Sequence, residues 1–389
     1  MNDLPRLLDA LSLAADQGQE AVIATVVKVE GSAYRRPGAR MVVAQLGAAT
    51  GTVSGGCLES DVSKKAWWFT ATGRPALRSY STGQDDDDLE EAELSFGLGC
   101  NGTVHILFER VPANGDCLVA RVLREVRDSW RPGLIATVIG SDDEHPVAIG
   151  ERVALAPGSG RHIEMRDQSL AARILEDLQT VHTAGRSATR LYDCASGVVE
   201  VLLEYIPAPR RLVLFGAGHD AQPLVNMASL QGWHTTVIDA RPQYARAERF
   251  PGADRVIAAP LAPLADLPAI LDGAAVVVMT HSLAQDRFWL DVALHGAPLY
   301  IGQLGPRSRT ERLLDEMEQP RRRAAFARLH YPVGLDTGGD TPDCVALSIL
   351  GEINAVLNDR DGGMLKNRTS SIHAVHMTLP EEPALRLIG

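Results

Sequence analysis

Cysteine is scarce in this sequence, and its spacing excludes two common kinds of site. The chain holds five cysteines among 389 residues, an odd number, and no two of them form a CxxC pair. Disulfide frameworks and structural zinc sites rely on paired or closely spaced cysteines. The sequence therefore predicts a protein of the reducing cytoplasm that has neither feature.

Long apolar runs and an excess of basic residues are also missing. No uncharged apolar stretch approaches the roughly 18 residues that a membrane helix needs, and the N-terminus lacks the basic segment and apolar core of a secretion signal. The formal net charge is −11, which argues against a nucleic acid as the main partner. We therefore expect a cytoplasmic protein that binds neither membranes nor nucleic acids.

What the sequence does contain is an internal repeat in its first half. Identical residues recur in the same order and spacing, namely Ile23–Val26 with Ile135–Val138, Gly38 with Gly150, and Arg40 with Arg152. The copies span about residues 20–113 and 132–208, and a chain of 389 residues is too long for a single ordinary core. The first half therefore predicts one domain that consists of two equivalent units.

Only the first copy carries a glycine- and cysteine-rich loop. The run Ser54-Gly55-Gly56-Cys57 falls opposite Arg166–Ser169 in the second copy, which has no glycine or cysteine there. An insert that ends in Phe96-Gly-Leu-Gly99-Cys100 is absent from the second copy altogether. Residues that the fold itself required would be present in both copies, so these residues indicate a functional site added to one of two scaffolds.

Each copy has the pattern of a small α+β unit. We expect an opening strand (21–29 and 133–140), a second strand (39–45 and 151–157), a helix (58–69 and 168–181) and two closing strands. Pro207 and Pro209 then indicate a short linker, because proline continues neither a helix nor a strand ladder. The first domain is expected to cover residues 1–206.

After the linker, short apolar strands alternate with helical or loop segments. The strands are expected at 212–215, 235–239, 255–257, 275–279 and 299–301. A final helix should begin after Thr341 as N-cap, with Pro342 in its first turn, and end near Leu357. This alternation predicts a parallel, doubly wound, Rossmann-like sheet over residues 210–358, with residues 359–389 as a separate tail.

The first turn of this second domain has the spacing of a dinucleotide fingerprint. Gly216, Gly218 and Ala221 give the pattern G-x-G-x-x-A, with His219 and Asp220 between them, and the following strand ends in Asp239. Such a turn lets a phosphate approach the backbone at a helix start, and the later acid can bind a ribose hydroxyl. One interpretation is therefore a bound nicotinamide dinucleotide. The alternatives are a turn that binds nothing and a turn that binds a ligand other than NAD.

More polar residues are expected at the same edge of the sheet. His281 follows one strand, Arg307 and Arg309 follow the next, and Asp336 lies in the glycine-rich loop before the final helix. Ligands of such folds bind beyond the carboxyl ends of the strands. We expect a crevice that accepts a phosphate. The alternatives are that His281 caps or packs, and that the two arginines are solvated.

Several motifs together resemble the XdhC/CoxI family, in order over about residues 5–357. They are Gly31-Ser-Ala-Tyr-Arg-Arg-Pro-Gly-Ala-Arg-Met41, Gly51-Thr-Val-Ser-Gly-Gly-Cys-Leu-Glu59, Phe96–Cys100, Phe215–Asp220, Tyr300–Arg307 and Pro332–Asp336 with the helix Ala346–Glu352. This family consists of maturation factors of molybdenum hydroxylases such as xanthine dehydrogenase. The resemblance implies that the chain binds the molybdenum cofactor (a pterin with a dithiolene, a phosphate and molybdenum), shields its sulfurated form and hands it to the apo-enzyme.

The residues expected to bind the cofactor come from both domains. They are Arg40, Ser54, Gly55, Gly56, Cys57, Glu59, Gly99, Cys100, Gly216, Gly218, His219, Asp220, Asp239, His281, Arg307, Arg309 and Asp336. Thiolates are soft ligands that suit molybdenum and sulfur chemistry, so Cys57 and Cys100 are the expected transient metal ligands. We expect their sulfur atoms to lie close together at one cleft. The alternative for either cysteine is a small buried apolar residue.

Three functions compete at this point. The first is a cofactor-binding chaperone, an accessory protein rather than an enzyme, whose partner is an apo molybdenum hydroxylase. The second is an NAD(P)-dependent oxidoreductase that uses the Rossmann-like domain. The third is a protein–protein adaptor without a ligand, against which stands the glycine–cysteine loop of the first copy. A cofactor-sulfurating enzyme as a second partner and a homodimer are left open.

Overall fold

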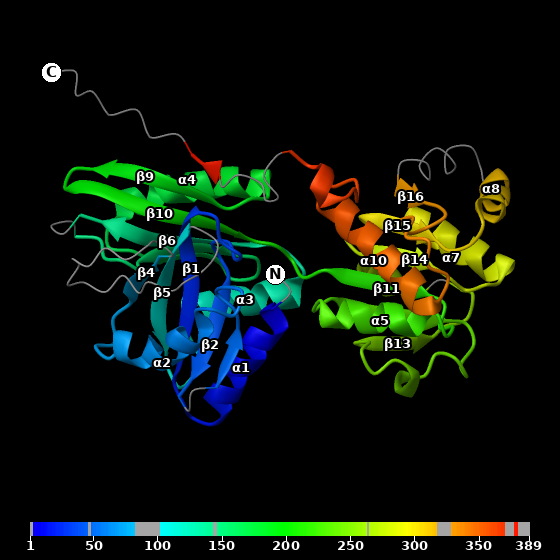
Figure 1. The fold of residues 1–389 in the computed structure, drawn as a ribbon, viewed down its shortest axis with the longest axis horizontal. Coiled ribbons are helices and arrows are strands. Elements are labelled where there is room, and N and C mark those ends of the chain that lie inside the picture. The colour runs from blue at the N-terminus through cyan, green and yellow to red at the C-terminus, as the bar shows by residue number, and fades with distance from the viewer. Residues whose placement is uncertain are drawn as a thin grey trace, which may run out of the picture. The chain divides into compact units, whose positions relative to one another are not determined.

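The computed structural model describes residues 3–45, 48–81, 102–142, 146–262, 264–316, 328–369 and 377–379. The chain forms two compact units, which are described separately (Figure 1). The first contains Asp3–Ala208 together with the C-terminal strand at Met377–Thr378, and the second begins at Pro209. In the described part of the chain, no helix is both long and apolar enough to cross a bilayer.

The first unit contains two antiparallel sheets with the same strand order. One sheet has the order β3-β2-β1-β5-β4, where the strands are β1 (Ala21–Gly31), β2 (Arg40–Ala44), β3 (Ala49–Gly51), β4 (Ala76–Tyr80) and β5 (Gly102–Val111). The other has the order β8-β7-β6-β10-β9, where the strands are β6 (Gly133–Ser141), β7 (Arg152–Ala156), β8 (Gly160–Glu164), β9 (Ala188–Cys194) and β10 (Gly197–Ile206). The predicted duplication is confirmed, and each copy has one short strand (β3, β8) that was not predicted.

Four helices in the described part of this unit cover the sheets, and two of them, α2 (Glu59–Phe69) and α4 (Gln168–Ala184), were predicted. The other two, α1 (Leu4–Asp16) and α3 (Leu118–Ser129), were not. Buried side chains of α1 and α3 share one apolar cluster with Ile23 of the first sheet and Ile135 of the second. The two copies are therefore joined by a common core.

Two ion pairs, one buried and one largely buried, also join the copies, and they are reciprocal. Arg40 on β2 donates from both terminal nitrogens to the Glu204 carboxylate on β10, over 2.7 and 2.5 Å. Arg152 on β7, which is the counterpart of Arg40 in the repeat, donates over 2.6 Å to Glu109 on β5. The side chains of Arg40 and Glu204 are 3% and 4% exposed. Arg40 was expected to bind the cofactor; this stays a prediction, and the structure shows its guanidinium paired with Glu204 inside the core.

The second unit contains a six-stranded parallel sheet of order β13-β12-β11-β14-β15-β16. Its strands are β11 (Arg211–Phe215), β12 (His234–Asp239), β13 (Arg255–Ala258), β14 (Ala275–Val278), β15 (Tyr300–Gln303) and β16 (Leu329–His330). One face packs on α5 (Ala221–Leu230) and α10 (Pro342–Leu357), and the other on α6 (Leu267–Leu271), α7 (Leu283–His295) and α8 (Arg307–Asp315). The predicted Rossmann-like fold is confirmed, with its topological switch point between β11 and β14.

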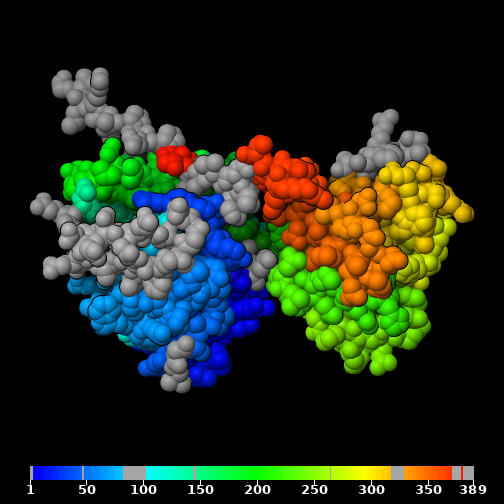
Figure 2. All heavy atoms as spheres, viewed as in Figure 1, coloured from blue at the N-terminus to red at the C-terminus, as the bar shows by residue number. Residues whose placement is uncertain are grey.

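Helix α10 begins as the sequence predicted. Thr341 is its N-cap and accepts a hydrogen bond from the Cys344 amide, and Pro342 occupies the first helical position. The segment after α10, which was expected to be a separate tail, is described in two pieces. Residues 359–369, with a short 3-10 turn η2 (Leu365–Asn367), lie on the surface of the second unit (Figure 2). Strand β17 (Met377–Thr378) instead pairs with β9 of the first unit.

The reciprocal ion pairs give a prediction about stability. Arg40→Met should leave the Glu204 carboxylate buried without a partner, which costs about 3–5 kcal/mol of unfolding free energy. The measurement is urea unfolding of the full chain, followed by a probe of the first unit. Arg166→Met is the control, because the Arg166 side chain is 77% exposed in its pair with Glu151, and should change stability by less than about 1 kcal/mol.

The double variant Arg40→Met/Glu204→Leu should recover most of the loss, because it removes both charges together. If Arg40→Met unfolded at the same urea concentration as Arg166→Met, the pair would have no part in joining the two copies.

Candidate functional site

The glycine–cysteine loop lies between β3 and α2 and is held by one carboxylate. Glu59, in the first turn of α2, accepts hydrogen bonds from the amides of Val53 (3.0 Å) and Ser54 (2.8 Å) and from the Ser54 hydroxyl (2.6 Å). The Ser54 oxygen in turn accepts from the amides of Gly56 and Leu58, both at 3.1 Å. These bonds tie both ends of the loop to the start of the helix.

Glu59 is therefore a bracing residue. Burial would raise the pKa of Glu59, but the hydrogen bonds from Ser54 and Val53 outweigh burial and lower the pKa below its ordinary value. The side chain stays ionised, and both of its oxygens already accept hydrogen bonds from the loop. Its expected contact with a cofactor stays a prediction; the structure shows only its bonds to the loop.

Cys57 lies at the exposed part of this loop. Its side chain is exposed, whereas the next residue, Leu58, is completely buried in the core of the first sheet. Gly56 has a φ of +115°, a conformation that residues with a side chain rarely adopt, and a Cβ built on it would meet no atom within 4 Å. Glycine is thus required by the backbone, and the space above it is open.

The other cysteines are placed differently. Cys117 and Cys194 are partly buried, and burial raises the pKa of both thiols. Cys117 also caps α3 by accepting a bond from the Ala120 amide. Gly99 and Cys100 lie outside the described residues, so the proximity of Cys100 to Cys57 stays a prediction. Within the described ranges, no group of three or more His, Cys, Asp or Glu residues could hold a metal ion.

In the second unit, the glycine turn follows β11 at the switch point. Gly216 has a φ of +124°, and a Cβ on it would lie 2.5 Å from the carbonyl oxygen of Met279 at the end of β14. Only glycine fits there. The next amide, of Ala217, donates to Asp239 over 2.7 Å. The turn is therefore fixed against both of its neighbouring strands.

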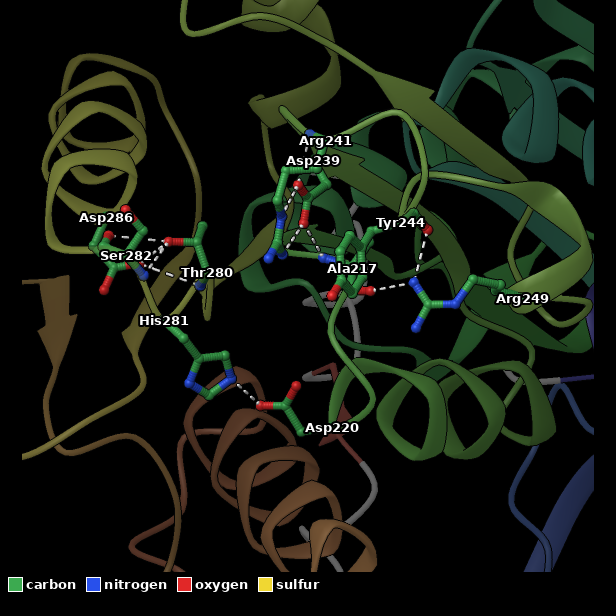
Figure 3. Close-up of polar contacts among 10 residues, drawn as sticks. All are labelled: Ala217, Asp220, Asp239, Arg241, Tyr244, Arg249, Thr280, His281, Ser282 and Asp286. Atoms are coloured by element: carbon green, nitrogen blue, oxygen red, sulfur yellow. Dashed lines mark hydrogen bonds and ion pairs between the residues drawn. The ribbon is translucent and has the colours of Figure 1, made fainter.

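Asp239 is saturated by protein donors. One of its oxygens accepts from the Arg241 amide and Nε at 2.9 Å each, and the other accepts from Ala217 and from Arg241 Nη2 at 2.8 Å (Figure 3). Burial would raise the pKa of Asp239, but these hydrogen bonds outweigh burial and lower it. The buried carboxylate has both oxygens engaged, which opposes the predicted role of binding a ribose hydroxyl.

Side chains also fill the space beside Asp239. Two guanidinium groups lie over the Tyr244 ring. That of Arg241 is 4.1 Å from the ring centre, and that of Arg249 is 5.0 Å from it. Arg249 donates to the carbonyl oxygens of Ala217 and Tyr244, at 2.8 and 3.0 Å (Figure 3). This half of the crevice, where an adenosine would bind in a dinucleotide enzyme, is occupied by the chain itself.

On the other side of the glycine turn, an exposed histidine is paired with an acid. His281 Nε2 lies 2.7 Å from Asp220 Oδ2, and His281 has a φ of +61°, which is uncommon for a residue other than glycine (Figure 3). A Cβ on Gly218 would lie 2.5 Å from the other Asp220 oxygen. The Asp220 carboxylate thus lies over the glycine turn, where its negative charge opposes the phosphate that the sequence predicted there.

The two predicted arginines differ in their surroundings. Arg309 donates over 2.6 Å to the buried Asp286, which also accepts from the Thr280 amide and hydroxyl. Asp286 therefore holds the backbone next to His281 in place, and Arg309 neutralises it. Arg307 is largely exposed and stacks on Tyr331 at 5.2 Å. Of the other predicted residues here, His219 and Asp336 are both exposed.

Comparisons with known proteins agree with this architecture of a duplicated antiparallel unit followed by a Rossmann unit. Residues 14–81 match the XdhC and CoxI family, and residues 212–353 match the XdhC Rossmann domain. A Bacillus subtilis protein named as a probable subunit of xanthine dehydrogenase is 32% identical over 357 residues, which cover 91% of this chain and 97% of that protein. The chain belongs to the XdhC and CoxI family.

Two further relatives are more distant. The molybdenum cofactor insertion chaperone PaoD of Escherichia coli is 25% identical over 340 residues, or 87% of this chain and 84% of that protein. A crystal structure from Bacillus halodurans, described as a xanthine dehydrogenase, superposes with a TM-score of 0.68 at 28% identity, and the match covers 91% of this chain and 96% of that one.

The bracing role of Glu59 gives a pH-dependent prediction. Glu59→Gln should lower the unfolding free energy by about 1–3 kcal/mol at neutral pH, because an amide cannot accept from three donors as a carboxylate does. Since the folded pKa of Glu59 is lowered, its contribution is complete above the unfolded pKa of about 4.3 and is lost as the pH falls through the folded pKa.

Denaturant unfolding of both proteins between pH 3 and 7 tests this prediction. The difference in unfolding free energy between the wild type and Glu59→Gln should decrease as the pH falls. A difference in unfolding free energy that stayed constant over this pH range would show that the carboxylate charge of Glu59 does not hold the loop.

Proposed function

We propose that this protein is a maturation factor that binds the molybdenum cofactor and delivers it to a molybdenum hydroxylase such as xanthine dehydrogenase. The observation that carries the proposal is the Cys57 loop, an exposed thiol on a braced glycine turn that only one copy of the repeat has. Relatives named as part of a xanthine dehydrogenase and as a molybdenum cofactor insertion chaperone support the same function.

The loop suits a cofactor that is carried and then released. A bound molybdenum cofactor would supply sulfur and metal groups for which a thiolate is a suitable soft ligand. A permanent metal centre needs several converging ligands, and Cys57 belongs to no such group among the described residues. Such a chaperone should hold its cofactor with moderate affinity, because it must release it to an acceptor.

The alternative of an NAD(P)-dependent oxidoreductase is supported only by the G-x-G-x-x-A turn at the switch point. Against it stand the saturated Asp239, the Tyr244 ring beside Arg241 and Arg249, and the Asp220 carboxylate over Gly218. A dinucleotide would have to displace the ion pair between Arg241 and the buried Asp239 and then bind next to the Asp220 carboxylate.

Cys57→Ala tests the proposal directly. The variant should reduce reconstitution of an apo molybdenum hydroxylase by about tenfold or more, because loss of even an outer partner of a metal site costs that much. The readout is substrate turnover by the reconstituted hydroxylase. The matched control is Cys194→Ala, which removes a partly buried thiol from the second copy and should leave reconstitution unchanged.

We also expect no hydride transfer from NADH or NADPH to simple carbonyl substrates by the purified protein. Robust nicotinamide turnover that Cys57→Ala left intact would overturn the proposed function and favour the oxidoreductase.

A further inference from the structure

An exposed aromatic ring lies beside the Cys57 loop. Aromatic residues make up only 5% of the chain. Among the described residues of the first unit, two aromatic side chains are exposed, Tyr34 (73%) and Trp68 (72%). Exposed aromatic rings are rare in this unit, and the position of Tyr34 beside the glycine–cysteine loop indicates a functional role.

Tyr34 belongs to a well-fixed connection between β1 and β2. Ala33, immediately before it, is buried in the core of the first sheet, and Arg35, immediately after it, forms an ion pair of 2.7 Å with Asp3. Further along, the Gly38 amide donates to the carbonyl oxygen of Val26 over 2.8 Å. The exposure of Tyr34 therefore results from a defined backbone path, with buried or paired residues on both sides.

The Tyr34 ring lies against the glycine–cysteine loop. A Cβ built on Gly55 would be 3.5, 3.7 and 3.8 Å from Cγ, Cδ1 and Cδ2 of Tyr34, so the ring covers Gly55 at ordinary contact distance. Gly56 faces open space, and Cys57 is exposed. The chain thus presents a flat aromatic ring, a stretch of bare glycine backbone and a thiol in succession.

This arrangement is confined to the first copy of the repeat. With Gly38 and Arg40 matched to Gly150 and Arg152, the position of Tyr34 falls on Pro146 in the second copy. The second copy therefore lacks both the ring and the thiol, although it has the same strands and the matching ion pair. The scaffold does not require either residue.

We infer that Tyr34 is the residue on which the pterin ring of the molybdenum cofactor stacks, with the dithiolene end directed toward Cys57. The inference rests on the proposed function and adds the ring-binding residue to it. A pterin is a flat heteroaromatic ring like a nucleobase, and an aromatic side chain binds such rings by stacking with little loss of conformational freedom. Because the glycine backbone separates ring and thiol, one ligand with a flat end and a sulfur end can contact both.

The test compares four variants and two probes. The probes are the isolated molybdenum cofactor and an oxidised pterin that lacks the dithiolene, each titrated while the pterin fluorescence is followed. Tyr34→Leu should weaken both probes by about tenfold, the size of one stacking contact. Tyr34→Phe should stay within about twofold of the wild type, because the ring remains.

Two controls separate ring binding from other effects. Trp68→Leu removes an equally exposed aromatic from α2 and should change neither affinity. Cys57→Ala should weaken the complete cofactor and leave the simple pterin unaffected. Melting temperatures equal to that of the wild type would show that Tyr34→Leu, a change at an exposed side chain, leaves the fold intact.

The outcomes distinguish this inference from the proposed function. If the wild type binds the cofactor and Tyr34→Leu binds both probes equally well, the stacking assignment is wrong and the chaperone function stands. An equal loss in Trp68→Leu would also overturn the assignment. If the wild type binds neither probe, the chaperone function fails and the assignment fails with it.

Discussion

The reciprocal pairs Arg40–Glu204 and Arg152–Glu109 determine how the two copies of the repeat join. Each pair takes a charge from both copies out of water, and such a pair is tolerated only when its geometry is good. A shift of either sheet by one residue would separate the charges and turn the apolar faces outward. The register of the strands, the common core with α1 and α3, and the positions of the connecting loops all depend on this arrangement.

Because the scaffold is the same in both copies, the difference between them lies in their loops. The second copy has the strands and the buried pair, whereas the first also has Cys57 on a loop braced by Glu59. The second unit shows the same separation of fold from function. Its sheet has the strand order of nucleotide-binding proteins, yet Asp239 is bonded to Arg241 and Ala217, so the resemblance of fold does not bring the usual ligand with it.

The sequence predicted the parts of the fold that depend on local pattern. Local pattern was enough to predict the apolar strands, the repeat and the helix start at Thr341–Pro342. The apolar spacing of Leu4, Leu8 and Leu11 would have predicted α1 as well. Contacts between residues that are distant in the sequence could not be predicted. Arg40 and Glu204 are 164 residues apart, so a motif that contains Arg40 suggested a ligand contact where the fold supplies an internal one.

Sequence reasoning anticipated the exposure of Cys57 but not the contacts that surround its loop. Cys57 is exposed as its glycine setting suggested, but the bracing by Glu59 and the contact between Tyr34 and Gly55 depend on the path of two loops. Asp286 and Tyr244 gave no signal, since a single acid in a helix and a tyrosine in a connection are ordinary in any sequence. Their roles follow from which atoms the strand ends bring together.

Strand β17 covers the first residues of the edge strand β9. It pairs with β9 at Ala188 and Thr189, and the amide of Leu379 continues the ladder to the carbonyl oxygen of Thr189 over 3.1 Å. An uncovered edge strand is a template for pairing with another chain, and β9 also carries the exposed Leu191. Removing β17 would add the backbone of Ala188 and Thr189 to the edge, so this short strand shortens the stretch with which another chain could pair.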